Sequence, residues 1–209
     1  MKEAERGRAT QPVPATAAIL ESIPLPPILS ILGEHGERAR KIRVIDDFRA
    51  SRVNDLLSTH DTGIPQNTDV FLGMTMVVGH HECAQPLKSC VADFAHAYKH
   101  IGVPSHQLDF ASILLCGPNG NSRVATMKTH PFGSSRAPAN WARLTSLVQF
   151  VLGKLFNVWM GIYVDDCFCV VPDAAVQSAI HPVRAFCSLI GLELERSKQQ
   201  LPSNSADLL

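Results

Sequence analysis

The sequence lacks three features that would each point to a class of protein. It has no excess charge, because 19 Lys and Arg residues balance 19 Asp and Glu residues among 209. That balance argues against a histone-like or tail-driven nucleic-acid binder, although it allows positive charge to be concentrated locally. It has no uncharged apolar run of about 18 residues, so we expect no membrane-spanning helix. Its six cysteines form no Cys-x-x-Cys pair, and a chain of this size does not depend on disulfides, so we expect reduced thiols.

The N-terminal residues also lack a targeting pattern. Residues 1–30 are rich in Pro and Ala, and they do not follow the signal-peptide order of basic head, apolar centre and small-residue cleavage site. We therefore expect an intracellular protein, cytoplasmic or nuclear and not secreted, with 1–30 as a flexible leader. The neighbouring residues His80, His81, Glu82 and Cys83 match no zinc spacing, so we expect no metal there.

The rest of the chain has the composition of a globular protein, with 45% hydrophobic and 18% charged residues. Residues 41–54 start as a strand and end in a turn, and 88–92 form a short buried strand that ends at Asp93. Two further pairs of strand-like runs are 110–116 with 122–128, around the turn Gly117-Pro118-Asn119-Gly120, and 158–164 with 167–171. Residues 64–78 have a mixed pattern broken by Gly and Pro, and predict no regular element.

Two segments have helical periodicity. Apolar residues recur at three- and four-residue steps over 138–155 and over 176–190, where Gly191 is a plausible stop. A final strand is expected over 192–199. The order strand, helix, hairpin, helix, strand predicts an α+β fold, with an antiparallel sheet covered by helices on one face.

Asp165 and Asp166 interrupt two strongly apolar strands. At a hairpin tip both carboxylates approach one point, and their repulsion is costly unless a cation is present. Mg²⁺ prefers oxygen ligands, and a two-metal site for phosphoryl chemistry needs carboxylates from at least two segments. Asp93 is the natural second source, because it also ends an apolar strand.

Five segments, in order, resemble the motifs of the reverse transcriptases of retroelements and retroviruses. Tyr163-Val164-Asp165-Asp166 resembles the aromatic-x-Asp-Asp signature of that family, and Asp93 with Ala97-Tyr98 resembles its first catalytic motif. The other three matches are Pro131-Phe132-Gly133 with Ala137-Pro138, the fingers segment from Lys41 to Arg49 with Asn54, and Gly191-Leu192 with Lys198. The matches cover about residues 41–200, and the Pro-Phe-Gly segment points weakly towards long-terminal-repeat-type or tyrosine-recombinase-type retroelements.

The resemblance implies a polymerase palm with a ferredoxin-like antiparallel sheet and helices on one face, plus partial fingers. The implied organisation is a leader at 1–30, partial fingers at 31–90 and a palm at 91–209. The family's thumb and RNase H segments find no counterpart, and we expect them to be absent.

The resemblance also implies an activity and its metal ligands. Asp93, Asp165 and Asp166 would be the catalytic residues and would bind two Mg²⁺ ions, or Mn²⁺, together with the backbone of Phe94. The implied reaction is template-directed DNA synthesis by nucleotidyl transfer, with an RNA or DNA template and its primer and deoxynucleoside triphosphates as partners.

The implied nucleotide-binding residues come from several segments. Tyr98 resembles the aromatic gate whose ring leaves no room for a 2′-hydroxyl, so deoxynucleotides are the expected substrates. Lys41 and Arg43 would clamp the triphosphate, whereas Arg49 is expected to pair within the fingers. The remaining contacts would come from Ala97, Phe132, Gly133 and Lys198.

Two other interpretations stay open from the sequence. The chain would be a truncated, inactive retroelement remnant, or another two-metal palm enzyme such as an RNA-templated RNA polymerase or a nucleotide cyclase. Tyr98 and the Asp-Phe-Arg segment speak against the latter. The sequence does not determine the oligomeric state, and Cys167 and Cys169 are most simply packing residues.

Overall fold

The computed structural model describes residues 2–22, 28–33, 43–57, 66, 68–81, 85–116 and 121–195, with backbone alone at 2, 28–33 and 43–45. These residues divide into two compact units, each made of two stretches of sequence. Unit 1 comprises Met1–Thr62 and Tyr98–Ala139, and unit 2 comprises Gly63–Ala97 and Asn140–Leu209. The expected boundaries of leader, fingers and palm at 1–30, 31–90 and 91–209 do not coincide with these discontinuous units and stay a prediction.

Unit 1 contains a five-stranded sheet in the order β1-β6-β5-β2-β3. Its pairs are antiparallel except β2 with β5, which is parallel. The strands are β1 (Val13–Pro14), β2 (Ile28–Gly33), β3 (Arg43–Asp46), β5 (Ser112–Cys116) and β6 (Ser122–Thr126). The predicted hairpin is confirmed in its two strands, β5 and β6, while its turn, residues 117–120, lies outside the described residues.

Short helices complete unit 1. They are α1 (Lys2–Glu5), α2 (Ala17–Glu21), η1 (Val53–Leu56) and η3 (Ser105–Ala111), and η2 (Ala97–His100) begins at the last residue of unit 2. A hydrophobic core joins residues far apart in sequence: Ala9, Phe48, Val53, Ala111, Ile113 and Met127.

The described part of the leader, residues 2–22, is packed into unit 1, which differs from the flexible segment expected. Val13 pairs with Val124 of β6, Ala9 is buried, and the Glu3 carboxylate lies 2.9 Å from the Lys99 ammonium. Pro14 fits because β1 is an edge strand, where a missing backbone N–H is tolerated. A Pro- and Ala-rich composition therefore does not separate a linker from a short edge strand.

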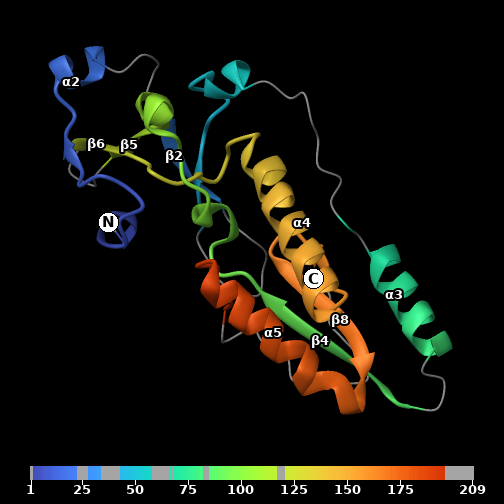
Figure 1. Cartoon of the computed structure of the whole chain (residues 1–209). Helices are drawn as coiled ribbons and strands as arrows, with labels where there is room; N and C mark the ends of the chain where they lie inside the picture. The colour runs from blue at the N-terminus through green and yellow to red at the C-terminus, as the bar shows by residue number, and fades with distance from the viewer. Residues whose placement is uncertain are drawn as a thin grey trace. The chain divides into compact units, whose positions relative to one another are not determined.

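Unit 2 contains a three-stranded antiparallel sheet in the order β4-β8-β7. The strands are β4 (Leu87–Asp93), β7 (Gly161–Tyr163) and β8 (Asp166–Pro172), and the helices are α3 (Thr68–His81), α4 (Ala137–Phe156), η4 (Asp173–Ala175) and α5 (Val176–Leu189). The first three residues of α4 belong to unit 1. Figure 1 shows α5 lying along β4, beside β8. The buried strand ending at Asp93, the apolar hairpin and both helices are thus confirmed.

The helices of unit 2 do not all meet the same face of the sheet. Cys90 and Cys169 are paired across β4 and β8 and pack against Val176 of α5. Phe168 contacts Phe71 of α3 with ring centroids 5.5 Å apart, and side-chain alternation places it on the other face. The expectation of helices on one face therefore describes α5 but not α3.

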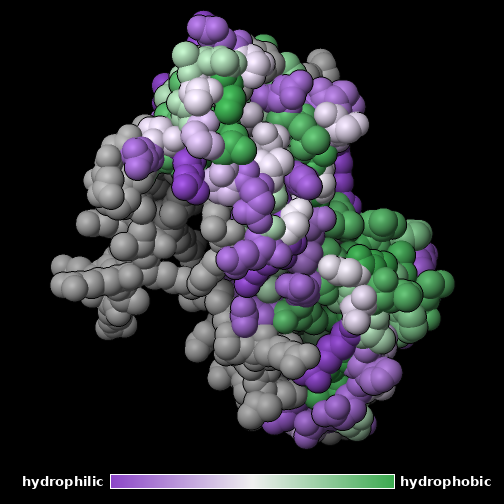
Figure 2. Space-filling view, turned by 90° about the vertical axis from the view of Figure 1, so that its left-hand side faces the viewer, coloured by the Kyte–Doolittle hydropathy of each residue, from purple (hydrophilic) through white to green (hydrophobic). Residues whose placement is uncertain are grey.

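Helix α3 is the longest of the elements that the sequence did not predict. None of its residues is buried, and Leu72, Met76 and Val77 are exposed. Its apolar residues are therefore not confined to one face, and the sequence of this segment has no clear helical periodicity. Helix α4 is also apolar on its outside, where Leu147 and Phe150 are more than half exposed, and hydrophobic residues are visible at the surface in Figure 2.

A final strand is expected at 192–199, of which residues 192–195 are described. These residues form an isolated antiparallel bridge, between Leu194 and Phe94, instead of a strand. Helices and mainly antiparallel sheets make the fold α+β, as predicted. None of the helices in the described part of the chain has the length and apolar character needed to cross a membrane.

Candidate active site

The strand register brings two of the predicted carboxylates together. Asp93, the last residue of β4, is paired with Asp166, the first residue of β8, and Tyr163 of β7 is paired with Asp166 from the other side. Directly opposite residues in antiparallel strands point to the same face, with Cβ atoms about 4.5–5.5 Å apart. Asp93 is buried, with 5% of its surface exposed, and Asp166 is half-buried. Two carboxylates from distant segments therefore lie side by side.

Asp165 lies in the two-residue turn between β7 and β8, after Val164. Its carbonyl oxygen accepts a hydrogen bond from the Phe94 N–H at 2.7 Å. The residue after Asp93 therefore ties the hairpin turn to the end of β4. Val164 has a φ of +53°, in the left-handed region that β-branched residues avoid.

Trp141 of α4 supports this turn from inside unit 2. Its indole Nε1–H donates a hydrogen bond to the Val164 carbonyl oxygen. Its ring packs edge-to-face on Phe94, with centroids 5.2 Å apart and an interplanar angle of 81°. Both rings are fully buried, at 2% and 1% exposure. The turn and the strand end that carry the aspartates are thus held by one aromatic pair.

The donor chemistry of the paired aspartates suits a hard divalent cation, because two neighbouring carboxylates supply oxygen ligands. No three His, Cys, Asp or Glu side chains gather into a metal-binding group within the described ranges. The structure therefore brings together Asp93 and Asp166 by register, and places Asp165 beside them through its backbone.

The opposite face of the same strands is occupied by thiols. Burial raises the pKa of Cys167 well above its usual range, and the nearby Cys187 thiol raises it further. The pKa of Cys169 is raised as well, through its hydrogen bond with Cys90 and through burial. Cys167 and Cys169 therefore stay protonated, and they pack against α5, as predicted for these two residues.

In unit 1, residues of two different predicted motifs meet. The ring of Tyr98, which follows the Asp93 segment, lies edge-to-face against Phe132 of Pro-Phe-Gly, with centroids 5.5 Å apart. Tyr98 is half-buried, and Phe132 is 40% exposed. The pair presents an aromatic surface to solvent instead of closing a core.

The Pro-Phe-Gly segment is fixed to the segment that resembles Asp-Phe-Arg. The Asp46 N–H donates to the Phe132 carbonyl at 3.2 Å. Gly133 has a φ of +105°, and a Cβ there would lie 1.9 Å from the Asp46 carbonyl oxygen. Asn54 completes the connection, because its side chain donates to the Gly133 carbonyl and accepts from the Ser135 N–H. Gly133 is thus required by a protein contact, independently of any nucleotide.

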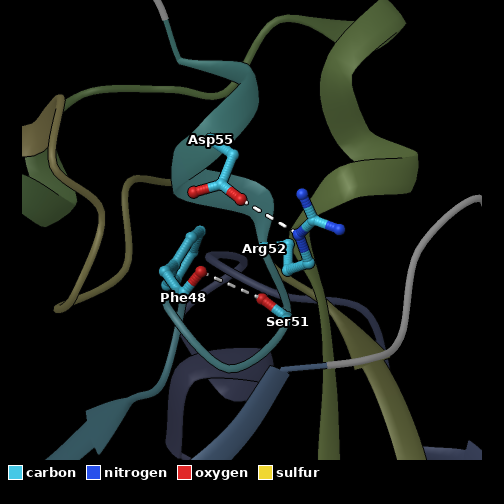
Figure 3. Close-up of polar contacts among 4 residues, drawn as sticks. All are labelled: Phe48, Ser51, Arg52 and Asp55. Carbon is cyan, nitrogen blue, oxygen red and sulfur yellow. Dashed lines mark hydrogen bonds and ion pairs between the residues drawn. The ribbon is translucent and has the colours of Figure 1, made fainter.

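The turn after Phe48 has its own polar contacts, shown in Figure 3. The Ser51 hydroxyl donates to the Phe48 carbonyl at 3.3 Å, and Arg52 forms an ion pair with Asp55 at 3.0 Å. The Arg49 N–H donates to the Asp47 carboxylate, and the Arg49 side chain is exposed. The Arg52–Asp55 pair is itself exposed and contributes little to stability.

The other residues predicted to contact the nucleotide belong to different units or lie outside the described residues. Ala97 is buried in unit 2, where its N–H lies 3.5 Å from the Phe94 carbonyl. Tyr98, Phe132 and Gly133 belong to unit 1. Lys41 and Lys198 lie outside the described residues, and Arg43 is described by backbone alone, in β3.

Sequence reasoning missed the residues that support the site. The helical periodicity over 138–155 includes Trp141 but does not indicate a role at the hairpin, whereas the structure places its indole at the turn. Gln66 accepts from the Ile162 N–H of β7 at 2.8 Å, and Gln149 donates to Gln66 and to the Met160 carbonyl. An isolated Gln carries no periodic signal, so nothing in the sequence identified this support.

Comparison with known proteins adds no relationship, because no protein-family model matches the chain and no curated protein is significantly similar to it.

Proposed function

We propose that this chain is the fingers and palm portion of a retroelement reverse transcriptase, an RNA-directed DNA polymerase. The observation that supports this most strongly is the pairing of Asp93 with Asp166 at the end of β4 and the start of β8. These aspartates lie 73 residues apart in sequence (166 − 93), and the resemblance places both in the same metal site. Asp165, the third member, is tied to Phe94 by a backbone hydrogen bond.

The topology of unit 2 is compatible with a polymerase palm. β4 and β7 run in the same direction on either side of the antiparallel β8, with α4 between them in sequence. The Phe94–Leu194 bridge continues the pairing on the free side of β4. This order of strands, followed by α5, is compatible with the split β-α-β arrangement of ferredoxin-like folds, which the proposal expects.

The contacts within unit 1 support the assignment of the remaining motifs. Asn54 and Asp46 come from the segment that resembles the fingers motif, and both bind the Pro-Phe-Gly backbone. Tyr98 lies against Phe132, so two residues proposed to contact the nucleotide share one aromatic surface. In the proposal, Tyr98 excludes the 2′-hydroxyl of ribonucleotides, and Phe132 and Gly133 contact the incoming deoxynucleotide.

The proposed mechanism assigns a task to each group of residues. Asp93, Asp165 and Asp166 would hold two Mg²⁺ ions, with the Phe94 carbonyl as a further ligand. These ions, when bound, promote attack of the primer 3′-hydroxyl and neutralise charge on the leaving pyrophosphate. Lys41 and Arg43 would bind the triphosphate, and Ala97 and Lys198 would line the nucleotide site. The pairing of β4 with β8 fixes the backbones of Asp93 and Asp166, and so limits where their carboxylates can lie.

Primer extension tests the proposal. The chain, in excess over a DNA primer annealed to an RNA template, is given Mg²⁺ and either deoxynucleotides or ribonucleotides. We expect extension with deoxynucleotides, loss of extension in Asp165→Asn, and retention in Asp173→Asn, a control at an exposed position after β8.

Three results would contradict the proposal in different ways. Extension by Asp165→Asn at the parent rate would show that the site is wrongly assigned. A preference for ribonucleotides would favour an RNA-templated RNA polymerase. Failure of a folded chain to extend a primer–template that it binds would favour an inactive remnant.

A further inference from the structure

The turn that carries Asp165 is held in an unfavourable backbone conformation. Val164 and Asp165 are the two central residues between Tyr163 and Asp166, which are paired. Val164, the first of them, has a φ of +53°. Turns with positive φ at this position strongly favour glycine, and a β-branched residue there is a true outlier. Some other interaction must therefore keep Val164 in this conformation.

The indole of Trp141 is that interaction. Its Nε1–H donates to the carbonyl oxygen of Val164, the peptide group whose orientation the unusual φ determines. A buried indole needs an acceptor for this donor, and Trp141 is only 2% exposed. Its position is itself fixed, because it lies on the 20-residue helix α4 and packs on Phe94. The hydrogen bond is thus made between a rigid donor and a strained turn.

The conformation of Val164 determines where Asp165 lies. The Asp165 carbonyl is bound by the Phe94 N–H, and the next residue, Asp166, pairs with Asp93. If Val164 relaxed to a negative φ, the peptide between Val164 and Asp165 would rotate and Asp165 would move relative to Asp93. We infer that Trp141 is a positioning residue, which holds the Val164 turn so that Asp165 can join Asp93 and Asp166 around a divalent cation. This inference rests on the proposed function only for the presence of that cation.

Four variants separate the hydrogen bond from the packing of the ring. Trp141→Phe keeps an aromatic ring against Phe94 but removes the N–H donor. Val164→Gly removes the steric cost of the positive φ, so the turn no longer needs the donor. The third variant combines both changes. The control is Trp159→Phe, at the second of the two tryptophans, which is 70% exposed.

Titration with Mn²⁺ alone, followed calorimetrically, is the first readout, because it requires no polymerase activity. We expect Trp141→Phe to weaken Mn²⁺ binding about tenfold, as substitutions that misplace metal ligands do. Val164→Gly and Trp159→Phe should bind nearly as the parent does. The double variant should recover most of the affinity that Trp141→Phe loses.

Thermal unfolding of the same four variants is the second readout. Trp141→Phe should lower Tm by roughly 2–4 °C, and the loss should be clearly smaller when residue 164 is glycine. In the Trp159→Phe chain, Trp141 is the sole tryptophan, so its fluorescence should change when Mn²⁺ binds. The fluorescence change reports Mn²⁺ binding near Trp141, and a structural role confined to ring packing would not produce the rescue by glycine.

The outcomes separate this inference from the proposed function. If the parent binds Mn²⁺ and Trp141→Phe binds it equally well, Trp141 does not position the aspartates, and the proposed function stands. If Val164→Gly rescues neither affinity nor Tm, Trp141 acts by packing alone and the inference is overturned. If the parent binds no Mn²⁺, the proposed function fails together with the metal-positioning part, and the unfolding data decide whether Trp141 holds the turn.

Discussion

The side-chain amide of Asn54 donates a hydrogen bond to the carbonyl oxygen of Gly133, 3.1 Å away. The same side chain accepts from the Ser135 N–H at 3.0 Å. One residue therefore satisfies two backbone groups of the Pro-Phe-Gly loop, about 80 residues further along the chain (133 − 54 = 79). An amide is suited to this position because it offers both a donor and an acceptor.

Substitution Asn54→Leu is expected to destabilise the protein by about 1 kcal/mol, because it removes two hydrogen bonds whose exposed backbone groups water can still reach. Asn54→Asp keeps only the acceptor for Ser135 and should be intermediate or worse, since its carboxylate faces the Gly133 carbonyl. Urea unfolding followed by circular dichroism measures both changes. Asn121→Ala, at an exposed position before β6, is the control. Equal stability of Asn54→Leu and the control would show that the connection does not hold the loop.

A pair of glycine substitutions tests the close approach at Gly133. Gly133→Ala should cost about 3 kcal/mol or more, because the positive φ is unfavourable and the new Cβ would lie 1.9 Å from the Asp46 carbonyl oxygen. Gly153→Ala, within α4, meets no atom within 4 Å and should stabilise the helix by about 0.5–1 kcal/mol. Chemical unfolding of the two variants should therefore give changes of opposite sign. A mild effect of Gly133→Ala would mean that the loop moves away from β3.

The sequence predicted the elements whose pattern is local. The helix over 138–155 and the strands on either side of Asp165 have strong periodicity or long apolar runs. They match α4 and β8 closely, whereas β7, at Gly161–Tyr163, is shorter than the run predicted over 158–164. Helix α3 was missed because none of its residues is buried, so its apolar residues form no stripe of period 3.6.

The site was predictable only in part, for a physical reason. Carboxylates that end or interrupt apolar runs can be recognised in the sequence, which therefore indicates Asp93, Asp165 and Asp166 but not the strand register that pairs Asp93 with Asp166. The hydrogen bonds of Trp141, Gln66 and Asn54 connect segments 23 to 96 residues apart. Such contacts leave no periodic trace, because a single side chain provides each of them.

The pairing of Asp93 with Asp166 predicts a conflict between stability and metal binding. Like charges directly opposite each other destabilise a strand pair. In the absence of metal, Asp166→Asn should therefore stabilise the protein by about 0.5–1 kcal/mol. Added Mn²⁺ should raise the Tm of the parent by binding the folded state, and raise that of Asp166→Asn much less. Differential scanning fluorimetry with and without Mn²⁺ gives both numbers, and Asp173→Asn is again the control. An Asp166→Asn chain that responds to Mn²⁺ as the parent does would remove this residue from the metal site.

The buried thiols predict a loss of stability at alkaline pH. Burial raises the pKa of Cys187 to about 11 from an ordinary 9.0. Between these values the unfolded thiol has lost its proton and the folded thiol retains it, so the folded state is disfavoured as pH rises. The free energy of unfolding should fall by up to about 1.4 kcal/mol per pH unit for this group. Urea midpoints from pH 8 to 11 measure the slope, which Cys187→Ala should reduce and Cys116→Ala, at an exposed thiol, should not. An unchanged slope in Cys187→Ala would assign the loss to other groups.

The contact between Tyr98 and Phe132 predicts how the proposed polymerase selects its nucleotide. The Tyr98 ring is supported edge-to-face by Phe132, and a fixed ring of this size is what would exclude a 2′-hydroxyl. Tyr98→Ala should therefore raise ribonucleotide incorporation relative to deoxynucleotide incorporation by about tenfold or more, a change of about 1.4 kcal/mol in discrimination. Tyr98→Phe keeps the ring and should leave the ratio near that of the parent. Phe132→Ala removes the support and should give an intermediate ratio. Competitive primer extension with the two nucleotides measures all three variants, and a ratio that follows the hydroxyl of Tyr98 instead of its ring would contradict the steric explanation.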